Sequence, residues 1–214
     1  MAKTRVMIVD DQHMARQYFE LLVAASDRYE VVDRVESATF ADTYVLRGRV
    51  DLVLLDVLMS DGSSSFDAAE RIKRLAPQVK VIMVTSIPEA SWMDEARERN
   101  VDGFWYKESE AQTILSVMDR VMAGERVYPK AAPATMVGAV SSADLTQREV
   151  QILRALVDGL TNEEMAERLC LAPSTVKTHM RHLLEKTGLE NRTQLALQAR
   201  LSGLVVGKAE LGLP

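Results

Sequence analysis

The chain has 214 residues, of which 47% are hydrophobic and 27% charged, and its formal net charge is −5. This length allows two small domains, and the composition is that of an ordinary globular protein. No apolar stretch approaches the roughly 20 residues needed to cross a bilayer, which excludes a transmembrane helix. The first apolar run, of about five residues, is too short for a secretory leader. We therefore expect a cytoplasmic protein with no membrane partner.

The first part of the chain alternates short apolar runs with amphipathic segments. The strand-like runs fall near residues 5–9, 31–35, 52–56, 80–85 and 102–107, and the helix-like segments near 13–25, 37–48, 65–75, 89–99 and 109–122. Runs rich in Val, Ile and Leu are typical of strands buried on both faces of a parallel sheet. The alternation over residues 1–123 therefore predicts an α/β domain with a doubly wound five-stranded parallel sheet and helices on both faces.

Polar residues stand where four of these five runs end: Asp10 and Asp11, Asp56, Thr85 and Lys107. The carboxyl ends of parallel strands share one edge, where open α/β sheets bind their ligands. Three carboxylates there would repel one another unless a hard cation such as magnesium (Mg²⁺) neutralises them. Each residue alone is more often a solvated strand end. Their joint occurrence on successive strands favours phosphoryl transfer, with Asp56 as the nucleophile and Lys107 and Thr85 binding phosphoryl oxygens.

Four motifs at these strand ends are Val-Asp-Asp, Leu-Asp-Val-Leu-Met, Val-Thr-Ser and Gly-Phe-Trp-Tyr-Lys. Together they resemble the receiver domain of response regulators, over residues 1 to about 122. The resemblance implies that Asp56 accepts a phosphoryl group from a sensor histidine kinase. It also implies that Mg²⁺ is held by Asp10, Asp11, Asp56 and the backbone carbonyl of Leu58. Thr85 and Lys107 would bind the phosphoryl oxygens. Phe104 stands where such domains keep a switch aromatic, with core packing as the plain alternative.

The loop after Asp56 departs from the receiver pattern. The family usually continues Met-Pro and has a glycine four residues after the proline. Here Ser60 replaces the proline, Ser64 occupies the glycine position, and Gly62 comes two residues earlier. Serine and glycine predict a polar and flexible loop. Its conformation bears on how long a phosphoryl group would persist on Asp56.

A linker and a helical tail follow. Gly124 suits a helix end, and the prolines and small residues after it predict a linker over 124–143. In residues 144–214, Thr146 and Thr161 each precede a Glu by three residues, which is the spacing of a capping box. Apolar stripes then predict a small all-α domain of four helices that start near Thr146, Thr161, Pro173 and Thr193.

The single cysteine, Cys170, lies inside a helical pattern, in the sequence Arg-Leu-Cys-Leu. One cysteine cannot form an intramolecular disulfide, and no set of zinc ligands lies near it in the sequence. We expect Cys170 to be a small side chain of the helical core rather than a reactive or metal-binding thiol.

Residues 124–214 carry 11 Lys and Arg against 10 Asp and Glu, so any nucleic-acid binding there must come from a local patch. Lys177 and Arg181 lie four apart on the third tail helix. On charge alone, an ordinary solvated helix is favoured over one that lies in a major groove. Ser174 or Thr175 is expected to cap the start of this helix with its side chain.

Longer motifs in residues 144–214 favour a helix that lies in the major groove of DNA. Four of them are Leu-Thr-Gln-Arg-Glu-Val, Gly-Leu-Thr-Asn-Glu-Glu-Met-Ala, Leu-Ala-Pro-Ser-Thr-Val-Lys-Thr-His and Leu-Leu-Glu-Lys-Thr-Gly. With these motifs, residues 144–205 resemble the LuxR/NarL-type helix-turn-helix. The resemblance implies that double-stranded DNA is a partner and that the last helix forms a homodimer. Of the residues that would contact DNA, Lys177, Thr178 and Arg181 would read bases, and Ser174, Thr175, His179, Lys186 and Arg192 would contact phosphates.

Three hypotheses about function follow. In the first, phosphorylation of Asp56 switches dimerisation and DNA binding by a transcription factor. The second keeps the DNA binding but makes the first domain a phosphorylation-independent dimerisation module, because of the altered Ser60–Ser64 loop. The third is an Asp-nucleophile phosphatase of the haloacid dehalogenase type. Those enzymes place two aspartates two residues apart after the first strand, whereas Asp10 and Asp11 are adjacent here. We therefore expect a regulator rather than an enzyme.

Overall fold

The computed structural model describes residues 2–89, 91–107 and 113–207. The chain forms two compact units, one of Met1–Ser86 with Ser91–Ala131 and one of Ile87–Ala90 with Ala132–Pro214. None of the helices in the described ranges is both long enough and apolar enough to pass through a bilayer.

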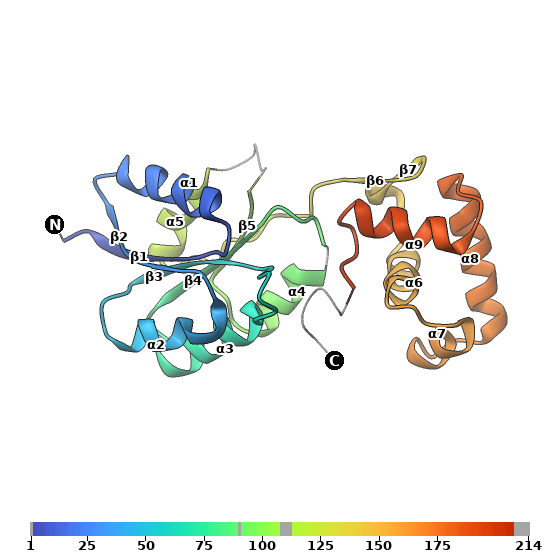
Figure 1. The fold of residues 1–214 in the computed structure, drawn as a ribbon, viewed down its shortest axis with the longest axis horizontal. Helices are drawn as coiled ribbons and strands as arrows, with labels where there is room; N and C mark the ends of the chain where they lie inside the picture. The colour runs from blue at the N-terminus through green and yellow to red at the C-terminus, as the bar shows by residue number, and fades with distance from the viewer. Residues whose placement is uncertain (1, 90, 108–112, 208–214) are drawn as a thin grey trace. The chain divides into compact units, whose positions relative to one another are not determined.

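The first unit contains a five-stranded parallel sheet in the order β2-β1-β3-β4-β5 (Figure 1). Its strands are β1 (Thr4–Val9), β2 (Tyr29–Val35), β3 (Leu52–Asp56), β4 (Lys80–Thr85) and β5 (Gly103–Tyr106). Every residue of β3 and β5 is buried, because helices cover both faces of the sheet. The predicted doubly wound sheet is confirmed, and the strand bounds lie close to those expected.

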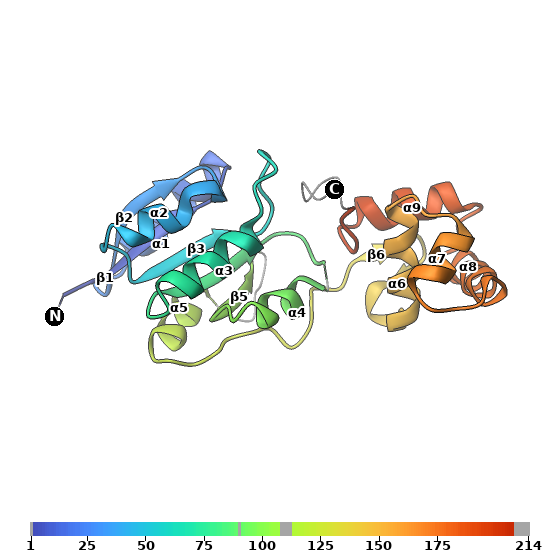
Figure 2. The same ribbon diagram turned by 90° about the horizontal axis from the view of Figure 1, so that it is seen from below.

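Helices α1 (His13–Ala24) and α5 (Ile114–Met122) cover one face of this sheet (Figures 1 and 2). There Phe19 and Val117 pack against Ile8 and Leu54 of the sheet. The other face is covered by the 3-10 helix η1 (Ala38–Phe40) and by α2 (Ala41–Leu46), α3 (Ser65–Leu75) and α4 (Ser91–Glu98).

Two helices of the first unit differ in extent from the ranges predicted for them. The segment expected over 37–48 is divided into η1 and α2, because Phe40 leaves the helical backbone conformation with a φ of −115°. The helix expected over 109–122 begins at Ile114 in the structure, after a cap in which Thr113 accepts a hydrogen bond from the backbone N–H of Ser116. Residues 108–112, which include the predicted start of that helix, and Ala90 lie outside the described residues.

The second unit is mainly helical. Its helices are η2 (Ser142–Asp144), α6 (Gln147–Val157), α7 (Asn162–Arg168), α8 (Pro173–Thr187) and α9 (Arg192–Leu201). Both predicted capping boxes are present, at Thr146 with Glu149 and at Thr161 with Glu164. The four predicted α-helices are confirmed, and their apolar faces form one core that includes Ile152, Met165, Leu183 and Leu195.

Part of the predicted linker is ordered. Strands β6 (Met136–Val137) and β7 (Val140–Ser141) pair antiparallel, and the buried Val137 joins the helical core. The turn between them begins at Gly138, whose φ is +59°. A Cβ atom on Gly138 would lie 2.3 Å from the carbonyl oxygen of Thr187, so this turn requires glycine.

The expectation for Cys170 is wrong. Helix α7 ends at Arg168, and Cys170 lies in the turn that follows, with a left-handed φ of 53° and an exposed side chain. The change of backbone direction ends the helical periodicity on which the expectation rested, so the thiol points away from the core.

Candidate functional site

Lys107 joins two of the predicted carboxylates at the carboxyl edge of the sheet. Its Nζ lies 2.8 Å from Asp10 Oδ2 and 2.6 Å from Asp56 Oδ1. Asp10 follows β1, Asp56 ends the neighbouring β3, and Lys107 follows β5. All three side chains are largely buried, with exposed fractions of 1% for Asp10, 6% for Asp56 and 14% for Lys107. The sheet topology therefore places one ammonium group between two carboxylates in a site that is largely shielded from solvent.

The remaining oxygens of these two carboxylates accept backbone hydrogen bonds. Asp10 Oδ1 accepts from the N–H of Gln12 at 2.9 Å, and Asp56 Oδ2 accepts from the N–H of Leu58 at 3.0 Å. Each of the four oxygens thus has a donor, which fixes both side chains in orientation.

Asp11 differs from its two neighbours. Its Oδ2 accepts a hydrogen bond of 2.8 Å from the backbone N–H of Ser60, whereas its Oδ1 is buried and has no hydrogen-bond partner among the described residues. A buried acceptor without a donor costs free energy, and a divalent cation would remove that cost. Within the described ranges, however, no three acidic, histidine or cysteine side chains already form a set that could hold a metal ion. Lys107 stands between Asp10 and Asp56 instead.

Burial and charge shift the pKa values of Asp56 and Lys107. Burial raises the pKa of Asp56 to about 6, although the Lys107 ammonium opposes the shift. Burial lowers the pKa of Lys107, but the carboxylates of Asp56 and Asp10 outweigh it and the net shift is upward. At neutral pH the site therefore holds an ionised Asp56 carboxylate beside a protonated Lys107.

Thr85 and Phe104 lie on β4 and β5. Thr85 is buried at the end of β4, the strand between β3 and β5, and its carbonyl oxygen accepts a 2.8 Å hydrogen bond from the N–H of Lys107. Phe104 is fully buried, with its ring centroid 5.3 Å from that of Tyr106 and 6.5 Å from that of Tyr128. In this conformation Phe104 is a core residue, and its switch role stays a prediction.

The serine-rich loop is polar, as expected, but hydrogen bonds attach it on several sides. The Oγ of Ser63 accepts from the backbone N–H of Ala38 at 3.1 Å. The Oγ of Ser64 caps α3 by accepting from the N–H of Asp67 at 3.2 Å. Hydrogen bonds from Ser37 and from Ser63 lower the pKa of Asp61. The serine in the usual glycine position thus has a local role as a helix cap, which limits the flexibility that composition alone predicts.

The sequence analysis missed one further residue at this edge, Arg16. Arg16 is 8% exposed, and its guanidinium donates a 2.7 Å hydrogen bond to the carbonyl oxygen of Asp10 and pairs with Glu36. It fixes the backbone at Asp10 from the first turns of α1. An arginine in an amphipathic helix is usually taken for a solvated residue, and only its place three residues before the buried Phe19 indicates that it faces inward.

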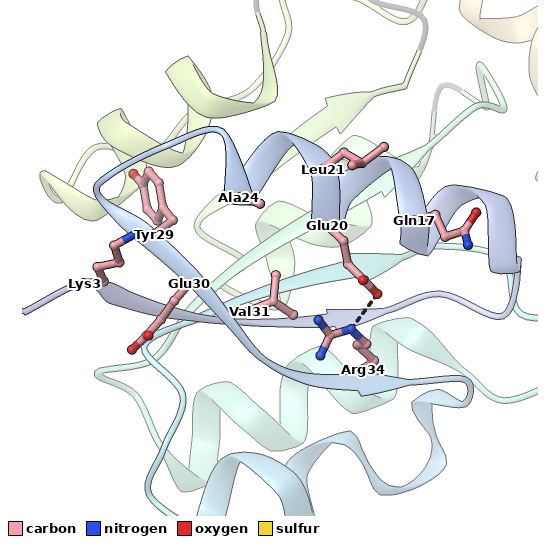
Figure 3. A pocket seen from close by; sticks show the side chains of 9 residues that line it. All are labelled: Lys3, Gln17, Glu20, Leu21, Ala24, Tyr29, Glu30, Val31 and Arg34. Carbon is pink, nitrogen blue, oxygen red and sulfur yellow. Dashed lines mark hydrogen bonds and ion pairs between the residues drawn. The ribbon is translucent and has the colours of Figure 1, made fainter.

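A pocket lies elsewhere in this unit, between α1 and β2 (Figure 3). Leu21, Ala24 and Val31 supply part of its wall, and Glu20 and Arg34 form a 2.6 Å ion pair within it. It includes none of the predicted site residues. Because its facing charges neutralise each other, we assign no ligand to it.

In the second unit, α8 presents a polar face. Ser174, Lys177, Thr178 and Arg181 are exposed, while Thr175 and His179 are half-buried. The expected side-chain cap is wrong: Ala172 is the N-cap residue, Pro173 starts the helix, and no side-chain hydrogen bond caps it within the described part of the chain. Proline at the first position supplies the fixed φ that a helix start needs, so a polar cap is less necessary.

Two predicted phosphate-contacting residues bond within their own unit. Lys186 Nζ lies 2.8 Å from the carbonyl oxygen of Asp144 and 3.1 Å from Glu149 Oε2. Arg192 donates a 2.8 Å hydrogen bond to the carbonyl oxygen of Leu160. On α9, the predicted dimer helix, Leu197 and Leu201 are 53% and 70% exposed and lie one helical turn apart.

Comparisons with known proteins agree with both units. Residues 6–119 match the response regulator receiver domain, and residues 143–199 match the bacterial regulatory proteins of the luxR family. Response regulator protein VraR of Staphylococcus epidermidis is 30% identical over 94% of this chain and 98% of its own length. Transcriptional regulatory protein LnrK of Bacillus subtilis is 28% identical over 94% of this chain and 99% of its own length.

Among solved structures, a complex of the two-component response regulator RcsB with DNA has a TM-score of 0.62 at 17% identity, over 95% of this chain and 100% of that one. At that identity the likeness concerns the fold alone. The matches to the family and to VraR carry the assignment: this chain belongs to the two-component response regulators that join a receiver domain to a LuxR-type DNA-binding domain.

Proposed function

We propose that Asp56 accepts a phosphoryl group from a sensor histidine kinase, and that the phosphorylated chain dimerises and binds double-stranded DNA. The observation that carries the proposal is the ammonium of Lys107, which lies within 2.8 Å of oxygens of both Asp10 and Asp56 at the end of β3. An oxygen of Asp56 forms the bond to phosphorus while the bond to the kinase imidazole breaks. The lysine then stabilises negative charge on the transferred group.

The donor set fits magnesium. Asp11 offers a buried oxygen without a hydrogen-bond donor among the described residues, and oxygen ligands are those that Mg²⁺ prefers. Asp11, Asp56 and the backbone carbonyl of Leu58 would hold the ion, with Asp10 beside them. When bound, the ion would neutralise charge on the phosphoryl oxygens. Lys107 would neutralise part of the same charge, and Thr85 would donate a hydrogen bond to a phosphoryl oxygen.

For DNA we propose that α8 enters the major groove. Lys177, Thr178 and Arg181 would read base edges, since all three are exposed on one helix whose opposite face is buried. Ser174, Thr175 and His179 would contact phosphates near the start of the helix. Lys186 and Arg192 would contact phosphates only with part of their donors, because each already bonds within the unit.

The dimer would form through α9. Leu197 and Leu201 leave an apolar strip on this helix, and a second copy of the chain would cover it. In this role the chain is a regulator that stores a phosphoryl group and does not turn over a substrate. We place it in the cytoplasm, where a kinase and DNA are both accessible.

The proposal is tested by incubating the full chain with phosphoramidate and Mg²⁺. We expect an increase in intact mass by one phosphoryl group, a shift toward dimer in gel filtration and tighter binding to genomic DNA fragments. Asp56→Asn is the control and should show none of the three. A wild-type protein that gains no mass, yet dimerises and binds DNA, would favour the phosphorylation-independent dimerisation module over this proposal.

A further inference from the structure

The loop after Asp56 reaches back to Asp11. The backbone N–H of Ser60 donates a hydrogen bond of 2.8 Å to Asp11 Oδ2, although the two residues are 49 positions apart. This bond joins the loop after β3 to the loop after β1. The second oxygen of the same carboxylate, Oδ1, is buried and has no hydrogen-bond partner within the described residues.

This arrangement gives the two oxygens different roles. A carboxylate whose Oδ2 is held by a backbone donor cannot rotate freely about its Cβ–Cγ bond. Oδ1 therefore keeps one direction before any cation binds. A ligand that is oriented in advance loses less conformational freedom on binding, and such supporting hydrogen bonds contribute measurably to metal affinity.

The donor is itself held in place. Five residues after Ser60 the chain enters α3, whose start is capped by the side chain of Ser64. Between them, Ser63 accepts a 3.1 Å hydrogen bond from the backbone N–H of Ala38. Because the far end of the loop is attached to α3 and to η1, the N–H of Ser60 has a defined position relative to Asp11.

We propose that the backbone N–H of Ser60 is a positioning group that holds Asp11 Oδ2 so that Oδ1 faces a divalent cation. The inference rests on the proposed function, since it requires Asp11 to be a cation ligand. The donor belongs to the backbone, so every residue except proline supplies it. The serine that stands in the usual proline position is what makes this contact possible.

The test measures the affinity of the full chain for Mg²⁺ and for Mn²⁺ by isothermal titration calorimetry. Ser60→Pro removes the donor, and Ser60→Ala is the matched control that loses the hydroxyl but keeps the N–H. We expect the proline variant to bind both cations about tenfold more weakly, in line with the usual cost of losing a supporting hydrogen bond. The alanine variant should bind like the wild type. Equal or tighter binding by the proline variant overturns the proposal.

Since proline also restricts the backbone, a second variant replaces Ser60 with its α-hydroxy acid analogue, which changes the amide to an ester and adds no ring. It should bind the cations as weakly as the proline variant, and wild-type affinity in the ester overturns the positioning role. A wild-type protein that binds neither cation overturns the magnesium site of the proposed function itself. The two failures are thus distinguished by the wild-type titration.

Discussion

Lys107 and Asp56 form a buried ion pair, with 2.6 Å between Nζ and Oδ1. The same ammonium lies 2.8 Å from Asp10 Oδ2, so one positive charge forms ion pairs with two carboxylates. Burial nevertheless raises the pKa of Asp56 to about 6. The Asp56 carboxylate is therefore ionised at neutral pH, but its ionisation costs stability.

The unfolding free energy should depend on Asp56 between pH 4 and 7. The folded pKa of about 6 lies above the ordinary value of 3.8, so in this window the folded state binds more protons and stability falls as pH rises. We would measure the unfolding free energies of Asp56→Asn and the wild type by urea denaturation in the presence of EDTA. From pH 4 to pH 7, the stability of the variant relative to the wild type should increase by on the order of 3 kcal/mol. A difference that does not change with pH contradicts the raised pKa.

Removing the lysine should destabilise the first unit. Lys107→Met leaves two buried carboxylates without their cation, and we expect a loss of about 3 kcal/mol at pH 8 by urea denaturation. The matched control is Arg120→Met, which breaks the exposed pair with Glu125 and should change stability by less than about 0.5 kcal/mol. Equal effects of the two variants would show that burial of the Lys107 pair has no energetic consequence.

Variants of the exposed face of α8 should affect DNA binding without affecting the fold. Lys177→Ala and Arg181→Ala should each weaken binding to operator fragments selected by the wild type by about 1–3 kcal/mol, and together abolish specific binding. Fluorescence anisotropy measures the affinity. Unchanged affinity in the double variant would falsify the assignment of α8 as the recognition helix.

Lys186→Ala should behave differently, because this lysine bonds to Glu149 and to the carbonyl oxygen of Asp144. We expect a loss of about 1 kcal/mol in stability, since the pair is partly exposed. Thermal unfolding separates the two kinds of lysine: Lys177→Ala should keep the wild-type midpoint, and Lys186→Ala should lower it. Identical midpoints would mean that Lys186 contributes to DNA contact alone.

The turn at Gly138 gives a test of the hairpin. Gly138→Ala forces a left-handed residue and places a Cβ against the carbonyl oxygen of Thr187, so we expect a loss of about 2 kcal/mol or more. Gly159→Ala is the control, with a similar φ of +82° but nothing within 4 Å of the added Cβ, and should lose only about 1 kcal/mol. If the two variants lose the same unfolding free energy, the hairpin does not pack against the carbonyl oxygen of Thr187 as described.

Much of the fold could be predicted because the patterns are local. Apolar runs of strand length, amphipathic segments and the capping boxes at Thr146 and Thr161 give element types and approximate bounds. The meeting of Asp10, Asp56 and Lys107 could also be predicted, since parallel strands bring their carboxyl ends to one edge.

The remainder depends on contacts between residues far apart in sequence. The Ser60 N–H meets Asp11 across 49 positions, and Lys186 meets Asp144 across 42 positions. The hairpin at Gly138 is two residues long on each side, too short for an alternating pattern to appear. Cys170 was misplaced because a single left-handed residue ends a helix without changing the apolar pattern around it.

The position of Cys170 has a practical consequence. It is the single cysteine of the chain, and it is exposed in the turn between α7 and α8. A maleimide dye would therefore attach at one place, three residues before the start of α8, in the natural sequence. Its fluorescence would report the approach of DNA or of a second copy of the chain without any mutagenesis.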